Sequence, residues 1–127
     1  MKKNAGFIIL VAALLLSATF RCCEAKDVWV AHWDSENLDI YVMDETITGE
    51  IADNGRWFKV STKRVRNGKL VDVVHWTYEK LRSDMWRYET NTMDGSHTTV
   101  VTVGNKVFEF CMDELGWEYT VQKYWYY

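Results

Sequence analysis

The chain has 127 residues, of which 48% are hydrophobic, 15% are aromatic and 26% are charged, and its formal net charge is −3. This length favours a single domain. The acidic balance and the lack of a basic stripe argue against a nucleic-acid partner.

The first 25 residues have the layout of a secretory signal peptide. Lys2 and Lys3 give a positive start, residues 5–16 form an apolar run, and Cys23 and Ala25 suit cleavage after Ala25. The run is too short for a mature membrane-spanning helix, which needs about 20 apolar residues. We therefore predict an exported protein, periplasmic, on the cell surface or secreted, with no transmembrane segment in the mature chain.

Lipid anchoring at Cys22 or Cys23 is the competing interpretation of this segment. A lipoprotein signal needs small residues just before the acylated cysteine, whereas Phe20 and Arg21 precede Cys22. A bulky aromatic ring and a charge do not suit that peptidase, so the sequence favours a chain without an anchor.

Cleavage after Ala25 would change both the charge and the cysteine count. It removes three of the 15 basic residues and one of the 18 acidic residues, which moves the formal charge from −3 to −5. Cys111 remains as the one cysteine, so no intrachain disulfide can form. Cys111 is predicted to be either a buried apolar residue or a thiol for intermolecular pairing.

Residues 26–127 are predicted to form a single β-rich domain. Residues 28–33 and 38–43 are rich in β-branched and aromatic residues, and the polar residues 34–37 between them favour a hairpin. One face of the second strand is apolar and carries Leu38, Ile40 and Val42.

The middle of the chain is expected to alternate between loops and strands. Residues 44–48 are predicted to leave the strand and residues 50–55 to form a loose loop. Residues 57–65 then form a strand. Asn67-Gly68, which suits a type I′ turn, leads into a return strand over residues 69–81.

Two more strands and a helix complete the prediction. Residues 85–92 and 97–103 form strands joined by a turn at Asp94-Gly95. Asn105 is a suitable N-cap and Gly116 a suitable stop for a helix. Its apolar residues recur at helical spacing and are expected to face the sheet: Val107, Phe108, Cys111, Met112 and Leu115. The predicted fold class is α+β, mainly an antiparallel β-meander with one C-terminal helix packed on it.

The order of these segments resembles the surface-adhesin protein E family, small exported proteins of diderm bacteria. Residues 28–112 carry the resemblance, in Trp29-Val30, Tyr41-Val42-Met43-Asp44 with Ile47, Trp57-Phe58-Lys59-Val60, Trp86-Arg87-Tyr88, and Val103-Gly104-Asn105 before the helix with Cys111. The resemblance implies an antiparallel sheet of about six strands with a closing helix. It also implies a surface or periplasmic role, with adhesion to host matrix proteins.

Two features of the sequence depart from that family. Family members often carry a second cysteine on a middle strand, and residues 81–86 contain none. The segment 117–127 also extends past the expected end of the family domain.

No arrangement of residues in the sequence indicates catalysis. His32, His75 and His97 lack the short spacings of a zinc site. None of the serines has the context of a nucleophile elbow, and Cys111 lies inside the predicted helix rather than at an activating N-terminus. We therefore expect a protein that is not an enzyme, with no metal and no cofactor.

Aromatic residues are the unusual feature, because all seven tryptophans and all seven tyrosines lie after residue 25. Most are expected to fill the core, and a surplus would mark a binding face for a protein or a glycan. The nominated binding residues are Trp117, Tyr119, Tyr124, Trp125 and Tyr127. The alternative is a structural or assembly role in the cell envelope, in which a sheet edge pairs with another chain; a homodimer is compatible with either.

Overall fold

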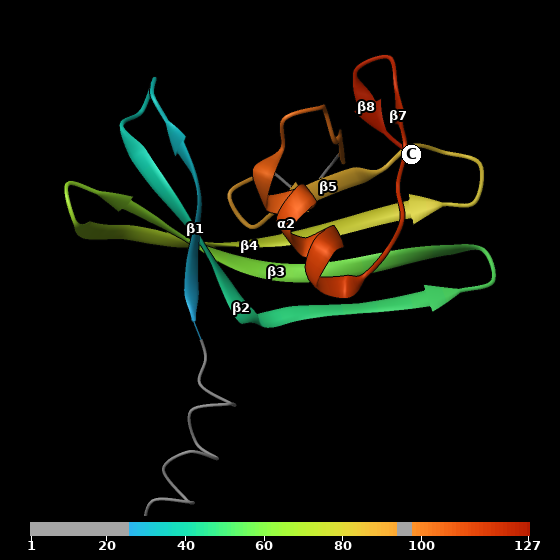
Figure 1. Ribbon diagram of the computed structural model, residues 1–127, viewed down its shortest axis with the longest axis horizontal. Coiled ribbons are helices and arrows are strands. Elements are labelled where there is room, and N and C mark those ends of the chain that lie inside the picture. The colour runs from blue at the N-terminus through green and yellow to red at the C-terminus, as the bar shows by residue number, and fades with distance from the viewer. Residues whose placement is uncertain (1–25, 94–97) are drawn as a thin grey trace, which may run out of the picture.

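The computed structural model describes residues 26–93 and 98–127, and it shows an antiparallel meander with one helix lying against it (Figure 1). The six-stranded sheet has the order β1-β2-β3-β4-β5-β6, which confirms the predicted fold class. Its strands are β1 (Asp27–Trp33), β2 (Leu38–Ala52), β3 (Gly55–Arg66), β4 (Lys69–Leu81), β5 (Arg87–Thr90) and β6 (Thr99–Val100). The predicted signal peptide at residues 1–25 and the turn at Asp94-Gly95 lie outside the described residues.

The first hairpin forms where the sequence predicts it. β1 pairs with β2 from Trp33↔Leu38 to Asp27↔Met43, with a β-bulge between Trp29 and Ala31. The predicted inner face of β2 is buried, since Leu38, Ile40 and Val42 are each at most 3% exposed.

The predicted break at residues 44–48 and the predicted loop at residues 50–55 are wrong. β2 continues to Ala52, and a shift in register between Met43 and Thr48 absorbs the polar residues without ending the strand. The Thr46 hydroxyl donates to the Met43 carbonyl at 2.6 Å and accepts from the Ser61 amide at 2.8 Å. These bonds replace the ladder bonds that the bulge interrupts.

The second hairpin confirms the Asn67-Gly68 prediction. Both residues have positive φ, 51° and 77°, as a type I′ turn requires. β4 then runs over the predicted residues 69–81 and buries Val74, Trp76 and Tyr78 on its inner face.

β5 and β6 are shorter than the predicted strands at residues 85–92 and 97–103. Trp86 does not continue the ladder with β4; its amide donates to the Tyr126 carbonyl, and its own carbonyl accepts from the Val101 amide. The ends of both strands are therefore bonded to the C-terminal segment, a pairing between distant residues that local sequence does not encode.

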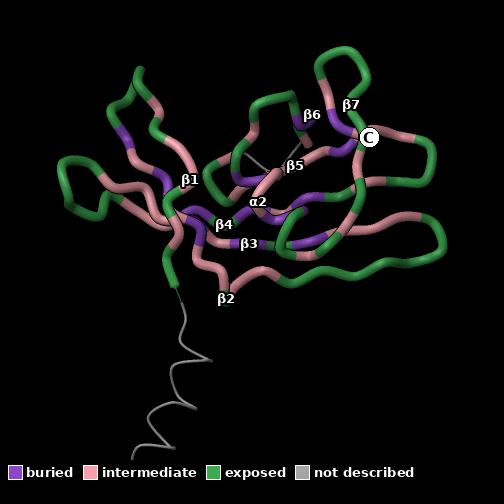
Figure 2. Tube along the Cα trace, viewed as in Figure 1, coloured by how far each residue is buried: buried purple, intermediate pink, exposed green. Residues whose placement is uncertain are grey.

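The helix α2 (Lys106–Leu115) has both predicted ends. The Asn105 side chain accepts from the Phe108 amide as N-cap, and Gly116 closes the helix with φ of 70°. Four of the five predicted apolar residues are buried, namely Val107, Phe108, Cys111 and Met112, and Leu115 packs partly buried against them. Figure 2 shows the buried stretches gathered where the sheet passes beneath the helix.

Cys111 is fully buried in this core, which confirms the first of the two predictions made for it. Desolvation raises the pKa of its thiol to about 12, with a smaller contribution from Glu114. A thiol with this pKa is a poor nucleophile at neutral pH.

The chain ends in a small hairpin, β7 (Val121–Gln122) with β8 (Trp125–Tyr126), that lies beside the end of the meander. Thr102 forms a β-bridge with Trp125, and the Tyr126 ring stacks on Phe108 at 4.5 Å between centroids. No helix among the described residues is long and apolar enough to cross a membrane.

Candidate functional site

A groove of about 570 Å³ lies between the first strand and the start of the helix. We call it the aromatic groove. It is lined by Trp29, Val30, Ala31, His32, Trp33, Trp76, Tyr88, Thr102, Val103, Gly104, Asn105, Lys106 and Val107. Its volume falls within the range of ordinary ligand pockets, about 300–1,000 Å³.

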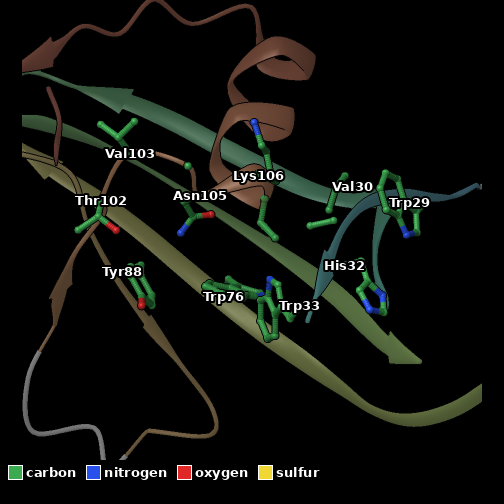
Figure 3. A pocket seen from close by; sticks show the side chains of 13 residues that line it. Trp29, Val30, His32, Trp33, Trp76, Tyr88, Thr102, Val103, Asn105 and Lys106 are labelled. Carbon is green, nitrogen blue, oxygen red and sulfur yellow. The ribbon is translucent and has the colours of Figure 1, made fainter. Parts of the chain in front are cut away.

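Two chain segments form the walls of the aromatic groove and two strands form its floor (Figure 3). Residues 29–33 of β1 stand on one side and residues 102–107 stand on the other. Trp76 of β4 and Tyr88 of β5 lie between them, with ring centroids 5.3 Å apart. The Trp76 indole donates from its Nε1 to the buried Thr62 hydroxyl at 2.9 Å, so its polar atom is already satisfied by the protein.

Trp29 stands at the rim of the aromatic groove and is 53% exposed. Its indole Nε1 donates to Asp39 Oδ1 at 3.0 Å, and His32 Nδ1 donates to the same oxygen at 2.9 Å. These two bonds, the one from Trp29 first, hold the pKa of Asp39 below its ordinary value. A half-exposed indole thus donates its N–H to a charged acceptor of the same protein.

The opposite wall is held by the core and by the C-terminal hairpin. The Asn105 side-chain oxygen accepts from the Phe108 amide at 3.0 Å and from the buried Tyr78 hydroxyl at 3.2 Å. The Gly104 amide donates to the Tyr126 hydroxyl at 3.1 Å, and that hydroxyl donates to Glu109 Oε1 at 3.0 Å. Burial raises the pKa of Tyr126 to about 12, so its hydroxyl keeps the proton that it donates.

A second hollow of about 200 Å³ adjoins the aromatic groove. The two share Trp33, Trp76 and Tyr88, and the second is completed by Arg64, Val74, Thr90, Thr92 and Met93. Arg64 is paired with Asp72, so the charge of the guanidinium is already balanced. The shared aromatic residues make the two hollows parts of one elongated surface.

The five residues nominated from the sequence do not line the aromatic groove. Trp117 and Tyr119 pack against the core, Trp125 and Tyr127 are partly buried and joined by a bond from the indole Nε1 to the Tyr127 hydroxyl at 3.1 Å, and Tyr124 is 74% exposed. Trp117 lies so close to Gly49 that a Cβ there would sit 2.8 Å from the indole. Four of the five nominated residues are thus at least partly buried, and only Tyr124 is largely exposed.

Ser61 and His75 form a serine–histidine pair that their spacing in the sequence does not reveal. Ser61 Oγ and His75 Nδ1 lie 2.7 Å apart, on neighbouring strands that place them side by side. Among the described residues, no carboxylate hydrogen-bonds to His75, and neither residue lines the aromatic groove. A Ser–His pair without an orienting acid lacks a part that nucleophilic catalysis uses.

Metal binding has no candidate cluster in the described part of the chain, where no group of three His, Cys, Asp or Glu side chains is arranged to hold a metal ion. His32 is bonded to Asp39 and lies 3.6 Å from Asp34. His97 lies outside the described residues.

Comparison of the chain with protein-family models, curated proteins and solved structures finds no match. The site must therefore be interpreted from its own residues.

The residues of the aromatic groove carry little signal in the sequence. Trp29, Trp33, Trp76 and Tyr88 are spread over three strands and appear there as ordinary strand aromatics. The one local indication of the site is the pair Trp29 and His32, two aromatic residues with ring N–H groups. They lie on a strand whose partner carries Asp39 directly opposite His32.

Proposed function

We propose that this protein is an exported, non-catalytic binding domain of the cell envelope or cell surface, and that it holds a protein or glycan ligand in the aromatic groove. The observation that carries the proposal is Trp29, an indole that is half-exposed at the rim of the groove and yet fixed by Asp39. Tryptophan is among the residues that contribute most at binding interfaces.

The rigidity of the aromatic residues supports the same proposal. Ordering side chains on binding opposes association by about 0.5–1.5 kcal/mol for each one that is immobilised. Trp29 and Trp76 are already held by hydrogen bonds to Asp39 and Thr62, so a ligand would find much of its contact surface in place.

Export and an adhesin-like role rest on the sequence. The charge, apolar run and small residues at positions 1–25 support secretion, and the resemblance to the surface-adhesin protein E family supports adhesion. The absence of a second cysteine after residue 25 is compatible with export, because the aromatic core supplies the packing that a disulfide would otherwise assist.

The test is retention of binding partners by the purified protein, offered envelope extract and host matrix proteins in parallel. We expect capture that falls at least tenfold in Trp29→Ala and is unchanged in Tyr124→Ala, a matched loss of an exposed aromatic ring away from the groove. Equal loss in both variants, or in neither, would contradict the aromatic groove as the site. Retention of envelope components alone would refute the adhesin-like role.

A second candidate, a structural or assembly component of the envelope, is favoured by one observation. Among the described residues, β1 is bonded to β2 only, so one edge of the sheet is open. Open edges tend to pair with other chains. Cross-linking in intact cells would support this candidate if the products join the protein through β1 to envelope proteins.

A further inference from the structure

The open edge of β1 and the aromatic groove lie at the same place in the fold. All five residues from Trp29 to Trp33 line the groove. Side chains of a strand alternate between its two faces, so a hollow lined by five consecutive residues borders the edge of the strand rather than one face. Among the described residues, the backbone groups on this side of β1 pair with no strand, and they border the hollow.

We propose that the aromatic groove takes an extended polypeptide segment, which adds to the open edge of β1 as a further antiparallel or parallel strand. This inference rests on the proposed function and names the ligand class of that same site. Backbone bonds to β1 would give affinity, and the aromatic side chains would select the residues of the segment.

The shape of the aromatic groove suits this occupant. Five strand residues extend over roughly 16 Å, and an added strand lies about 4.8 Å from its neighbour. Residues 102–107 stand across the groove from β1 and confine it from the far side. The volume of about 570 Å³ is the space that such a segment would occupy.

The side chains around the slot define the chemistry of the segment. On the inner side, Trp33, Trp76 and Tyr88 present aromatic rings, and they continue into the second hollow. Trp29 and His32 are bonded to Asp39, which alternates along β2 with the buried Leu38 and Ile40, so their rings lie on the outer side of β1 at the rim. The segment should therefore carry apolar residues at alternate positions and no proline in the paired stretch, since proline lacks an N–H.

The bulge between Trp29 and Ala31 limits which chains can bind. Bulges and coverings are devices by which edge strands avoid indiscriminate pairing. The bulge interrupts the pairing of β1 with β2 at Val30 and bends the strand there, so the outer edge of β1 is less regular, and we expect a segment to fill the aromatic positions as well to stay bound.

The experiment selects linear peptides from a random 12-residue display library on the immobilised protein and then replaces each backbone amide of the tightest peptide, in turn, with its N-methyl form. N-methylation removes a donor and leaves the side chain unchanged. We expect affinity to fall at least tenfold at alternate positions over the paired stretch and to change less than threefold at the positions between them. An effect without a period of two would overturn the inference.

Two protein variants assign the peptide to the groove and separate the possible failures. Trp29→Ala should weaken the selected peptide at least tenfold, whereas Tyr124→Ala should not. If no peptide is selected but a glycan array gives Trp29-dependent binding, the polypeptide inference fails and the proposed function stands. If nothing binds in a Trp29-dependent manner, both fail. A concentration-dependent dimer that Trp29→Ala abolishes would identify a second copy as the occupant and overturn the assignment to a foreign segment.

Discussion

The Tyr126 hydroxyl connects the C-terminal hairpin to the wall of the aromatic groove, and Tyr126→Phe removes that connection alone. The hydroxyl accepts from the Gly104 amide at 3.1 Å and donates to Glu109 Oε1 at 3.0 Å, and Tyr126 is 1% exposed. A hydrogen bond contributes about 1 kcal/mol net, and one to a charged group contributes about 1.5–3 kcal/mol. Glu109 keeps Lys106 as a partner, so we expect a total loss of about 2 kcal/mol.

The assay is thermal and urea unfolding followed by circular dichroism. At about 4–8 °C per kcal/mol for a domain of this size, Tyr126→Phe should lower Tm by about 8–16 °C. Tyr124→Phe removes the same hydroxyl from an exposed ring and should leave Tm unchanged. If the two variants unfold within about 0.5 kcal/mol of each other, the hydroxyl does not brace the wall and the reasoning is refuted.

Three further outcomes follow from the contacts of the core and the rim. Asn105→Ala should lower the free energy of unfolding by about 2–3 kcal/mol in urea titrations, because it removes the helix cap and leaves the buried Tyr78 hydroxyl unpaired. Asn105→Asp keeps the acceptor oxygen and should lose less stability. Equal losses in the two variants would contradict this account. The Cys111 thiol should react with iodoacetamide only as fast as the protein unfolds. Because its folded pKa of about 12 exceeds the ordinary 9.0, the stability that it contributes is present below pH 9 and falls as pH rises toward 12. The free energy of unfolding of Cys111→Ala should therefore fall less steeply over this pH range. The pKa of Asp39 is lowered in the folded state, so its bond to Trp29 should persist below pH 3.8 and break only as pH falls through the lowered pKa. A pH titration of the Trp29 indole N–H signal by NMR measures this change. A titration midpoint above pH 3.8 would argue against the bond.

The parts of the fold that the sequence predicted are those set by local chemistry. Asn67-Gly68 can adopt the positive φ of a type I′ turn, and Asn105 and Gly116 mark the ends of the helix. The continuation of β2 was missed because its polar residues read as a loop, whereas Thr46 satisfies its hydroxyl and the Ser61 amide inside the strand.

The candidate site was not predictable because it depends on contacts between distant segments. The nominated C-terminal aromatics are conspicuous in sequence, but Trp117 and Tyr119 pack against the core. Tyr126, which was not nominated, is the residue that bonds to Gly104 and Glu109. The groove itself appears only when β1 stands opposite residues 102–107. No local pattern in the sequence specifies that approach.

The measurement that tests the central claim most directly is an NMR titration of the ¹⁵N-labelled protein with the component that it retains from envelope extract or host matrix. We predict that the indole and amide signals of Trp29 and Trp33 shift with the ligand, together with the amides of residues 102–106 that stand across the groove. The amide of Tyr124 should stay in place. Shifts at Tyr124 and the C-terminal hairpin with no change at Trp29 or Trp33 would contradict the aromatic groove as the binding site.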